Sequence, residues 1–457
     1  MKTVVIVGAG FSGAVLAAQL LNQHLNDVRL VLINRSGPMG RGLAYGTNSA
    51  VHLLNVPAGN MSAYVEQPSH FLNYCKSKGL NVTDSSFVPR QVYGEYLSDI
   101  LKQAEKRSGG GISFQQISAE VLGMRYQDNQ FEIRLKNGSR LHAQHAVLAL
   151  GNFSPAVPHE LNALRDSGYY IQDPWSAELD QKSLEPNESV LLIGTGLTAL
   201  DTATRLLQQG HSGSIYMVSR RGLLPLPHRR GNRQPTLDYP VQKELLQSHP
   251  SVLNYSRILR SIIKRTECDW RDIIAAIRPI TDKLWSRLNH CERSRFLRHL
   301  QPYWDIHRHR VAPDSFDIFK ASCASRQIKT FAGRIQSFAI TDNRLSLLIK
   351  PRSTESAIEI EVGRIINCTG PNTNLELVNE PLINQLMESK LALQDEQKLG
   401  LLVNDDLTLA NELSKGGASL SYIGPMLKAK YWEATAVPEL RKYAAELAAS
   451  IAQRLKS

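Results

Sequence analysis

The chain begins with MKTVVIVGAGFSGAVLAAQLLNQHLNDVRLVLIN, residues 1–34, and this stretch decides the fold. A short apolar run precedes Gly8, Gly10 and Gly13, and an Ala- and Leu-rich segment then leads to a second apolar run. This order predicts a strand, a tight turn, a helix and a second strand. Gly8 permits the turn, Gly10 lets a pyrophosphate approach the backbone, and Gly13 lets the helix pack closely on the strand. A dinucleotide site is favoured over a purely structural turn because all these elements fall within about 30 residues.

The residue that ends the second predicted strand departs from the usual pattern. An acidic residue normally binds the adenosine ribose at this position, and this chain has Asn34 instead. An asparagine amide still hydrogen-bonds a ribose hydroxyl, but it carries no charge. We therefore expect Asn34, together with Ser12 in the glycine turn, to take part in the nucleotide site.

A second stretch repeats the pattern of the first. SVLLIGTGLTALDTATRLLQQG, residues 189–210, contains Gly194 and Gly196, and the next apolar run is SIYMVSRRG. Ala199 replaces the third glycine, which the motif admits. The strands that follow are repeated as well, since residues 112–152 and 328–371 alternate apolar and polar residues in the same order. These closing runs end at equivalent glycines, Gly151 and Gly370.

The repetition predicts an α/β fold with two Rossmann-like dinucleotide-binding domains. Two such domains imply two dinucleotides, and hydride transfer from a nicotinamide to a flavin is the chemistry that connects them. We expect a helical insertion in the second domain, because its apolar residues have helical spacing. The simplest architecture makes this insertion a cap on the second domain. The predicted division is 1–154 and 372–457 for the FAD-binding domain, 155–235 and 314–371 for the NAD(P)H-binding domain, and 236–313 for the insertion.

The second domain offers basic residues where an acid would bind a ribose. Ser219, Arg220 and Arg221 follow its second strand, and Thr198 lies in its glycine turn. A carboxylate would repel a 2′-phosphate, whereas guanidinium groups bind it with charge-assisted hydrogen bonds. This pattern favours NADPH over NADH. The alternative is that both arginines are solvated surface residues.

Composition and charge narrow the class of protein. The chain has 457 residues, 42% hydrophobic and 21% charged, as in an ordinary globular protein of two or three domains. It starts with a strand rather than a signal sequence, and we expect a cytoplasmic protein. Five scattered cysteines without a C-x-x-C pair exclude disulfide reductase chemistry and a structural zinc site. The net charge of +11 is compatible with a nucleic acid, an acidic membrane surface, anionic small ligands or no partner at all. Of these partners we do not expect a nucleic acid.

Two segments are candidates to border a flavin ring. The glycine-rich loop that follows Asn34 continues to Tyr64 and is interpreted as wrapping a cofactor, with a plain surface connection as the alternative. Within it, Asn55 is a candidate to hydrogen-bond the polar edge of the ring, and Met61 is a candidate cofactor contact. Near the C-terminus, Glu433 is a candidate acid or base. The plain alternatives are that Asn55 forms a turn and that Glu433 is a charge at a helix N-terminus.

The insertion is rich in arginine and also contains His307 and His309. No metal site is expected at these histidines, because a third ligand at fixed spacing is missing and neighbouring arginines repel cations. The arginines either guide an anionic substrate or partner, or form a solvated helix face.

Long motifs along nearly the whole chain resemble those of a known family. The chain is similar to the two-dinucleotide-binding-domain flavoproteins and, within them, to the bacterial FAD/NAD(P)-binding proteins related to the YdhS protein. The motifs are GRGLAYGT, HLLNVPAGNMSA, PRQVYGEYL, ALGN, LLIGTGLTALD, SRRGLLPLPH, DWRDIIAAIRP, RFLRHLQPYWDIHRHRVAP, INCTGP and GPMLKAKYWEATAVPELR. The resemblance implies FAD in the first domain, NAD(P)H in the second and kinship with N-hydroxylating and other flavin monooxygenases. It also implies cofactor contacts at Gly424 and Pro425, while Asn34 and Ala429 depart from the expected pattern.

These observations lead to one primary hypothesis and two alternatives. The primary hypothesis is an FAD-dependent NAD(P)H oxidoreductase of monooxygenase type, acting on a small polar substrate that is anionic or amine-bearing. The first alternative is a reductase that passes electrons to a quinone or another acceptor. The second is a non-catalytic nucleotide-binding sensor. No apolar run reaches membrane-spanning length, and a peripheral membrane contact stays open.

Overall fold

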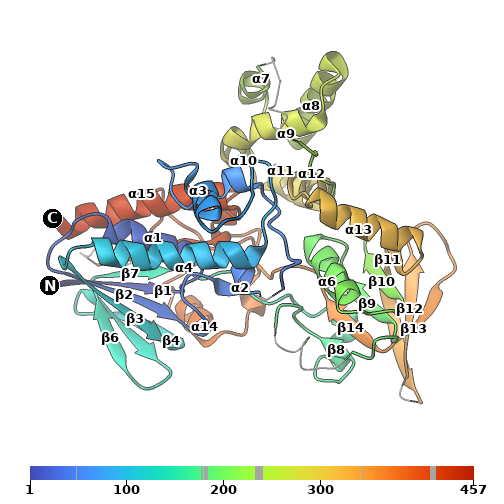
Figure 1. Ribbon diagram of the computed structural model, residues 1–457, viewed down its shortest axis with the longest axis horizontal. Helices are drawn as coiled ribbons and strands as arrows, with labels where there is room; N and C mark the ends of the chain where they lie inside the picture. The colour runs from blue at the N-terminus through green and yellow to red at the C-terminus, as the bar shows by residue number, and fades with distance from the viewer. Residues whose placement is uncertain are drawn as a thin grey trace.

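The two glycine motifs lie in two separate sheets, and a group of helices stands over the junction between them (Figure 1). The computed structural model describes residues 1–47, 49–176, 179, 184–231, 240–342, 344–411 and 418–456. Both motifs occupy the same position in their sheets, at the carboxyl end of the strand that carries them. The predicted α/β fold with two dinucleotide-binding domains is confirmed.

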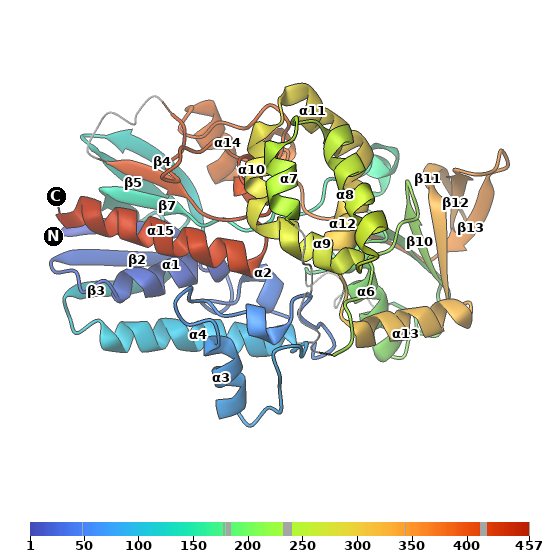
Figure 2. The same cartoon turned by 90° about the horizontal axis from the view of Figure 1, so that it is seen from above.

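The first sheet has five parallel strands in the order β15-β7-β1-β2-β3. Its strands are β1 (Lys2–Val7), β2 (Val28–Asn34), β3 (Ile112–Ser118), β7 (His145–Leu148) and β15 (Ser419–Tyr422). The central strand β1 is apolar and buried from Val4 to Val7, because both faces of a parallel sheet are covered. The covering helices pack side by side (Figure 2). They are α1 (Phe11–Leu21), α4 (Arg90–Arg107) and α15 (Val437–Lys456).

The second sheet repeats this order and extends it. Its strands run β13-β12-β11-β10-β9-β14-β8, and β11-β10-β9-β14-β8 corresponds to β3-β2-β1-β7-β15 of the first sheet. These strands are β8 (Tyr170–Ile171), β9 (Val190–Ile193), β10 (Ile215–Ser219), β11 (Ile328–Thr341), β12 (Arg344–Pro351), β13 (Ile358–Val362) and β14 (Arg364–Asn367). The first domain builds its antiparallel sheet separately, from β4 (Val121–Gln127), β5 (Gln130–Leu135) and β6 (Arg140–Ala143). The predicted repetition of the closing strands is therefore confirmed.

The first glycine of each motif has the same structural role. Gly8 and Gly194 have φ angles of +107° and +116°, a region that favours glycine. A Cβ at Gly8 would lie 2.4 Å from the carbonyl oxygen of Ala149, and one at Gly194 would lie 2.5 Å from that of Cys368. Each strand therefore meets its neighbour so closely that only glycine fits.

The insertion is a bundle of short helices above the junction (Figure 2). It contains α7 (Val241–Gln247), α8 (Val252–Thr266), α9 (Trp270–Ile277), α10 (Thr281–Arg287), α11 (His290–Arg295) and α12 (Gln301–Arg308). The predicted helical insertion is interrupted at Pro279 and Pro302, which lack the N–H that a continuous helix needs. The chain there forms a 3-10 turn, Arg278–Ile280, and a π-helical turn, Phe296–Leu300.

The insertion packs on both domains rather than on the second alone. Its hydrophobic core includes Ala429 and Trp432 of the first domain. Arg278 also forms a bidentate ion pair with Glu439 at the start of α15, with N···O distances of 2.6 and 2.7 Å. The expected cap on the second domain is thus a cap that bridges the two domains.

Five further helices belong to the described residues of the first and second domains. They are α2 (Gly42–Tyr45), α3 (His70–Ser77), α6 (Leu197–Gln208), α13 (Pro313–Ala324) and α14 (Pro381–Glu388). Within the described residues, no helix combines the length and the hydrophobicity that crossing a membrane requires.

Candidate functional site

The N-terminus of α1 forms an anion cradle. Gly10 caps the helix without a side-chain hydrogen bond, and the first turn, which includes Ser12 and Gly13, contains no acidic residue. The backbone N–H groups of a first helical turn have no partner within the helix, and the helix dipole favours an anion there. Gly13 packs against the preceding turn, since a Cβ there would lie 1.9 Å from the Gly8 carbonyl oxygen.

A basic residue adjoins this cradle. It was not predicted from the sequence as a cofactor contact. Gly42 lies against Gly10, and a Cβ at Gly42 would be 2.9 Å from the Gly10 Cα. The preceding residue, Arg41, has a buried Nε without a hydrogen-bond partner among the described residues. A buried unpaired guanidinium N–H next to an open helix N-terminus is the donor that a pyrophosphate requires.

Other residues predicted for the first cradle lie at the carboxyl edge of the same sheet. Gly151 follows β7, and a Cβ there would meet open space. Gly424 follows β15 with a φ angle of +152°, and Pro425 begins the 3-10 helix after it. Asn34 ends β2, and its amide nitrogen donates to the carbonyls of Ser36 and Gly37, which leaves its oxygen as an acceptor.

The second domain has a matching cradle at the N-terminus of α6. Gly196 caps this helix in an extended conformation, without a side-chain hydrogen bond or an acidic residue in the first turn. A Cβ at Gly196 or at Gly370 would meet open space. Thr198 lies in the first turn, where its carbonyl accepts a hydrogen bond from the Thr202 hydroxyl. The structure therefore gathers four predicted NAD(P)H-binding residues, Gly194 included, at one edge of the sheet.

The two arginines after β10 have different surroundings. Arg220 is exposed, and no ion pair of its side chain occurs among the described residues. Arg221 donates to the carbonyls of Arg298 and His299 in the insertion, at 2.8 and 3.4 Å. Ser219 bonds to the hydroxyl of Thr195 at 2.8 Å. Only Arg220 is therefore fully available for a phosphate.

Polar contacts join the two domains beside the cradles. Arg90, on α4, forms an ion pair of 2.7 Å with Asp201 on α6, and both side chains are largely buried. The Arg90 Nε also donates to the carbonyl of Leu53. On the other side, the ring of His228 bonds through Nε2 to the carbonyl of Asn55 at 3.0 Å. These contacts fix the loop of the first domain against the second domain.

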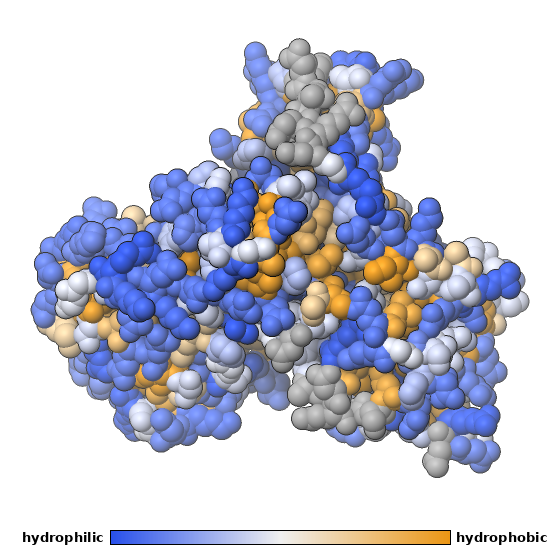
Figure 3. Space-filling model, viewed as in Figure 1, coloured by the Kyte–Doolittle hydropathy of each residue, from blue (hydrophilic) through white to orange (hydrophobic). Residues whose placement is uncertain are grey.

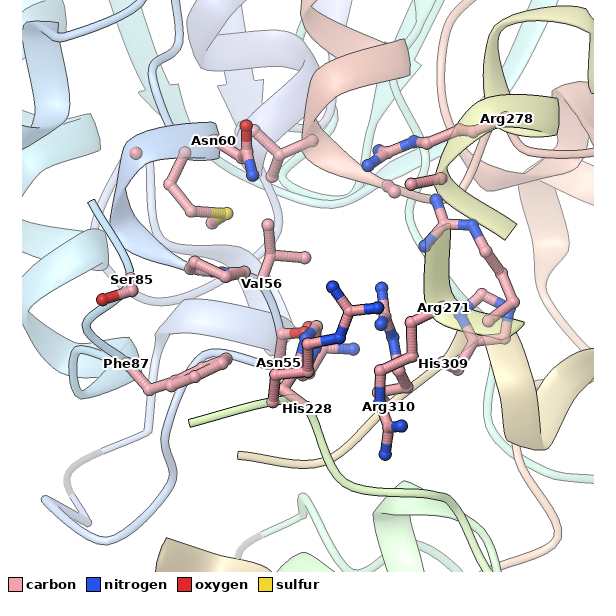
Figure 4. A pocket seen from close by; sticks show the side chains of 18 of the residues that line it. Asn55, Val56, Asn60, Ser85, Phe87, His228, Arg271, Arg278, His309 and Arg310 are labelled. Atoms are coloured by element: carbon pink, nitrogen blue, oxygen red, sulfur yellow. The ribbon is translucent and has the colours of Figure 1, made fainter. Parts of the chain in front are cut away.

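A cavity of about 560 Å³ lies where the two domains and the insertion meet. Apolar side chains are exposed in the middle of this face of the molecule, below the insertion (Figure 3). Asn55 and Met61, both predicted cofactor contacts, line the cavity together with the start of α15. Figure 4 shows Arg271, Arg278 and Arg310 across the cavity from Asn60. A cavity of this size accommodates a small-molecule ligand.

The cavity wall is strongly basic. Its charged residues are five arginines and two aspartates, namely Arg229, Arg271, Arg278, Arg308, Arg310, Asp84 and Asp272. Four of the arginines have acidic partners: Arg229 binds Asp269 and Asp272, Arg271 binds Asp269, Arg278 binds Glu439 and Arg308 binds Glu433. Among the described residues, no acidic partner of Arg310 is found. Burial, and then repulsion by the neighbouring arginines, lowers the pKa of Arg310 to about 10, so it stays charged at neutral pH.

Glu433 lies behind this wall and is 3% exposed. Its carboxylate is 2.8 Å from the Nε of Arg308 and accepts a hydrogen bond of 3.0 Å from the indole of Trp304. Glu433 is not a helix N-terminal charge, because α15 begins four residues later. Its position suits a carboxylate that orients Arg308 toward the cavity.

The buried ring of His228 makes the stability of the protein pH-dependent. Burial, and then the charge of Arg310, lowers the pKa of His228 to about 3. Because the unfolded chain binds a proton near pH 6.5 and the folded chain does not, stability falls as the pH decreases from about 6.5 toward about 3. His228→Gln is expected to reduce this loss by up to about 1.4 kcal/mol per pH unit. Urea denaturation across this pH range measures the slope, and an unchanged slope in the variant contradicts the assignment.

Most of the residues that build the cavity were not predicted from the sequence. Arg271, Arg278 and Arg310 belong to the insertion, whose arginines were noted as a group but not placed. The available signal was the position of all three inside long motifs, DWRDIIAAIRP for Arg271 and Arg278 and RFLRHLQPYWDIHRHRVAP for Arg310. Helical spacing alone gives no information on which loop of another domain a helix faces, so His228 and the insertion arginines had no predicted partner.

Comparisons with known proteins agree with this fold. A family model described as FAD-NAD(P)-binding matches residues 5–153. A search of curated protein sequences found no match. Among solved structures, ornithine hydroxylase (PvdA) from Pseudomonas aeruginosa is similar, with a TM-score of 0.66, 15% identity and 99% of each chain covered. L-lysine 6-monooxygenase from Pseudomonas syringae has a TM-score of 0.67, 16% identity, and 100% of this chain and 99% of that chain covered.

A third similar structure is named together with its ligands. It is the ornithine N-hydroxylase KtzI from Kutzneria sp. 744 with reduced FAD, NADP+ and L-ornithine, with a TM-score of 0.67, 12% identity and 99% of each chain covered. At these identities the likeness establishes the fold. The chain therefore contains an FAD-NAD(P)-binding domain at its N-terminus and has the fold of the two-dinucleotide-binding-domain flavoproteins.

Proposed function

We propose that the protein is an FAD-dependent NADPH oxidoreductase of monooxygenase type that acts on a small polar substrate. One observation supports this function above all. The basic cavity lies where a loop of the first domain, the N-terminal end of α15 and the insertion meet, beside two open dinucleotide cradles. FAD, when bound, accepts hydride from NADPH and activates oxygen, and the protein supplies binding, orientation and protection from water.

The residues of the first domain fit FAD. The uncapped first turn of α1 and the unpaired Nε of Arg41 supply donors for a pyrophosphate. The amide oxygen of Asn34 can accept a hydrogen bond from a ribose hydroxyl. A carboxylate oxygen at this position would accept the same bond in the same geometry. Asn55 and Met61 line the cavity, so we assign them to the flavin end of the cofactor. The family model described as FAD-NAD(P)-binding covers the same residues.

The polar residues of the cavity have positioning roles in this proposal. The Asn55 carbonyl accepts a hydrogen bond from His228, which leaves the side-chain amide of Asn55 as the group that orients a ligand. We propose that Glu433 positions Arg308 rather than transferring a proton, because both of its oxygens face partners. No step of acid–base catalysis is therefore assigned to Glu433.

Arg220 is proposed to bind the 2′-phosphate of NADPH. Arg220→Ala is expected to raise the KM for NADPH by about tenfold and to leave the KM for NADH unchanged, because only NADPH carries the phosphate. Steady-state kinetics with both coenzymes measure the change. Arg221→Ala is the matched control: its guanidinium already binds two carbonyls of the insertion, so coenzyme preference stays the same. An unchanged preference in Arg220→Ala contradicts the assignment.

The monooxygenase and its alternatives differ in the fate of oxygen. The similar structures are named as hydroxylases or monooxygenases of ornithine, lysine and cadaverine, which are small amines. The test combines purified protein, NADPH and a panel of such compounds, and it measures NADPH, oxygen, hydrogen peroxide and hydroxylated product. A monooxygenase forms product mole for mole with NADPH oxidised. NADPH oxidation that needs a quinone and forms no product supports the reductase, and nucleotide binding without turnover supports the sensor.

Three further assignments belong to the same proposal. We place the chain in the YdhS-like group of bacterial flavoproteins, on the long motifs described above. We retain the division into domains at residues 154, 313 and 371, and the boundary at residue 235 lies outside the described residues. We also propose a cytoplasmic location, where NADPH is available as a reductant.

A further inference from the structure

We propose that the cavity binds substrates through an acidic group, a carboxylate or phosphate held by Arg310, and that it rejects purely cationic amines. This inference rests on the proposed function and specifies its substrate class. The named substrate of one similar structure, cadaverine, carries only amines. The cavity of this chain has a charge distribution suited to a different ligand.

The first observation is the balance of charge on the cavity wall. Five arginines line the cavity, and the aspartates that line it are Asp84 and Asp272. Asp272 is 4% exposed and forms an ion pair of 2.7 Å with Arg229, so it has no charge to offer an ammonium group. Asp84 is an exposed residue of the first domain. Ion pairs with carboxylates likewise offset four of the arginines. A cation entering the cavity therefore meets the charge of Arg310, which no carboxylate of the described residues offsets, and this disfavours its binding.

The second observation is that Arg310 has no acidic partner among the residues that the structure describes. Each of the other four arginines of the wall forms an ion pair with a carboxylate. The Nε of Arg310 is buried and has no hydrogen-bond acceptor within the described part of the chain, and the guanidinium lies 6.0 Å from the ring centre of Trp270. A charged group held among like charges favours an added anion, and a guanidinium binds carboxylate or phosphate oxygens in pairs. A ligand oxyanion completes the site.

The third observation is that the charged and polar groups near Arg310 are themselves held in place. Arg271 is fixed by Asp269 and by the carbonyl of Pro227, and it stacks on Trp270 at 4.4 Å. The ring of His228 is held by the Asn55 carbonyl at 3.0 Å. Fixed neighbours mean that an anion enters a preformed site, which lowers the entropy cost of binding.

Three compounds with the same five-carbon chain test the inference. Glutarate has two carboxylates, 5-aminopentanoate has one carboxylate and one amine, and cadaverine has two amines. Isothermal titration of the FAD-bound protein, saturated with NADP+ so that the coenzyme site is occupied, measures the affinity for each. We expect glutarate and 5-aminopentanoate to bind at least about tenfold more tightly than cadaverine. Titration with inorganic phosphate separates a phosphate preference from a carboxylate preference.

Variants test whether Arg310 is the residue that binds the acidic group of the ligand. Arg310→Gln is expected to weaken glutarate binding at least about tenfold, and Arg310→Lys to weaken it less, because lysine keeps the charge without the planar fork. Arg260→Gln removes the same charge from an exposed position on α8 and is expected to leave the affinity unchanged. Bound FAD and the melting temperature verify that each variant is folded. If Arg310→Gln does not fold, Arg310→Lys and the three-compound comparison decide.

Two results overturn the inference. The first is cadaverine binding as tightly as glutarate, or no binding of either acid. The second is equal glutarate affinity in Arg310→Gln and Arg260→Gln. Failure of the proposed function is distinguishable, because it appears as absent FAD or absent NADPH oxidation before any acid is added.

Discussion

Gly196→Val is expected to give a yellow protein that NADPH no longer reduces. Gly196 caps α6 with φ −81° and ψ −169°, an extended conformation that valine adopts without strain. A Cβ at this position meets open space, so the substitution leaves the fold intact. The added side chain occupies the approach of a pyrophosphate to the helix N-terminus. We expect kcat/KM for NADPH to fall by about 100-fold or more, while FAD content is unchanged.

Two companion variants make this result specific. Gly168→Val adds the same side chain at an exposed glycine of the second domain, where a Cβ also meets open space, and it is expected to have no effect. Gly10→Val places the side chain in the first cradle and is expected to remove FAD. Full NADPH activity in Gly196→Val contradicts the assignment of the second cradle to the coenzyme.

Glu433→Ala is expected to cost about 3–5 kcal/mol of the free energy of unfolding. Glu433 and Arg308 are 3% and 8% exposed, and removal of the carboxylate leaves the guanidinium buried without its counter-charge. The indole of Trp304 also loses its acceptor. Urea denaturation followed by fluorescence measures the loss.

A matched control and a rescue distinguish this pair from a general effect of α15. Glu446→Ala removes an exposed carboxylate from α15, the helix that follows Glu433, and is expected to change stability by less than about 0.5 kcal/mol. The double variant Glu433→Leu with Arg308→Met replaces both charges and is expected to recover most of the stability. A loss in Glu433→Ala no larger than in Glu446→Ala contradicts a buried ion pair.

The fold could be predicted from the sequence because its signals are local. Gly8 and Gly194 mark strand-to-helix turns that only glycine can make, and each turn is followed by its helix and strand within about 30 residues. The repeated order of the closing strands then gives the sheet order by analogy between the two halves. The limits of the insertion helices were less predictable, since Pro279 and Pro302 interrupt a continuous helical spacing.

The candidate site was harder to predict because it depends on contacts between distant segments. Asn55 was selected from its loop, but its contact with His228 joins residues 173 positions apart. Arg278 and Glu439 are likewise 161 positions apart. Glu433 was chosen for its chemistry, and only the packing of the insertion reveals that Arg308 is its partner. Spacing along one element carries no information on such pairs.

The central claim is that two cradles hold an electron-donating coenzyme and a flavin in one functional unit. The most direct test mixes the purified, FAD-bound protein with NADPH without oxygen and records the flavin absorbance. The account predicts that the yellow colour bleaches with NADPH, and that Gly168→Val bleaches as the wild type does while Gly196→Val does not. A wild-type protein that holds FAD and keeps its colour at saturating NADPH contradicts the account.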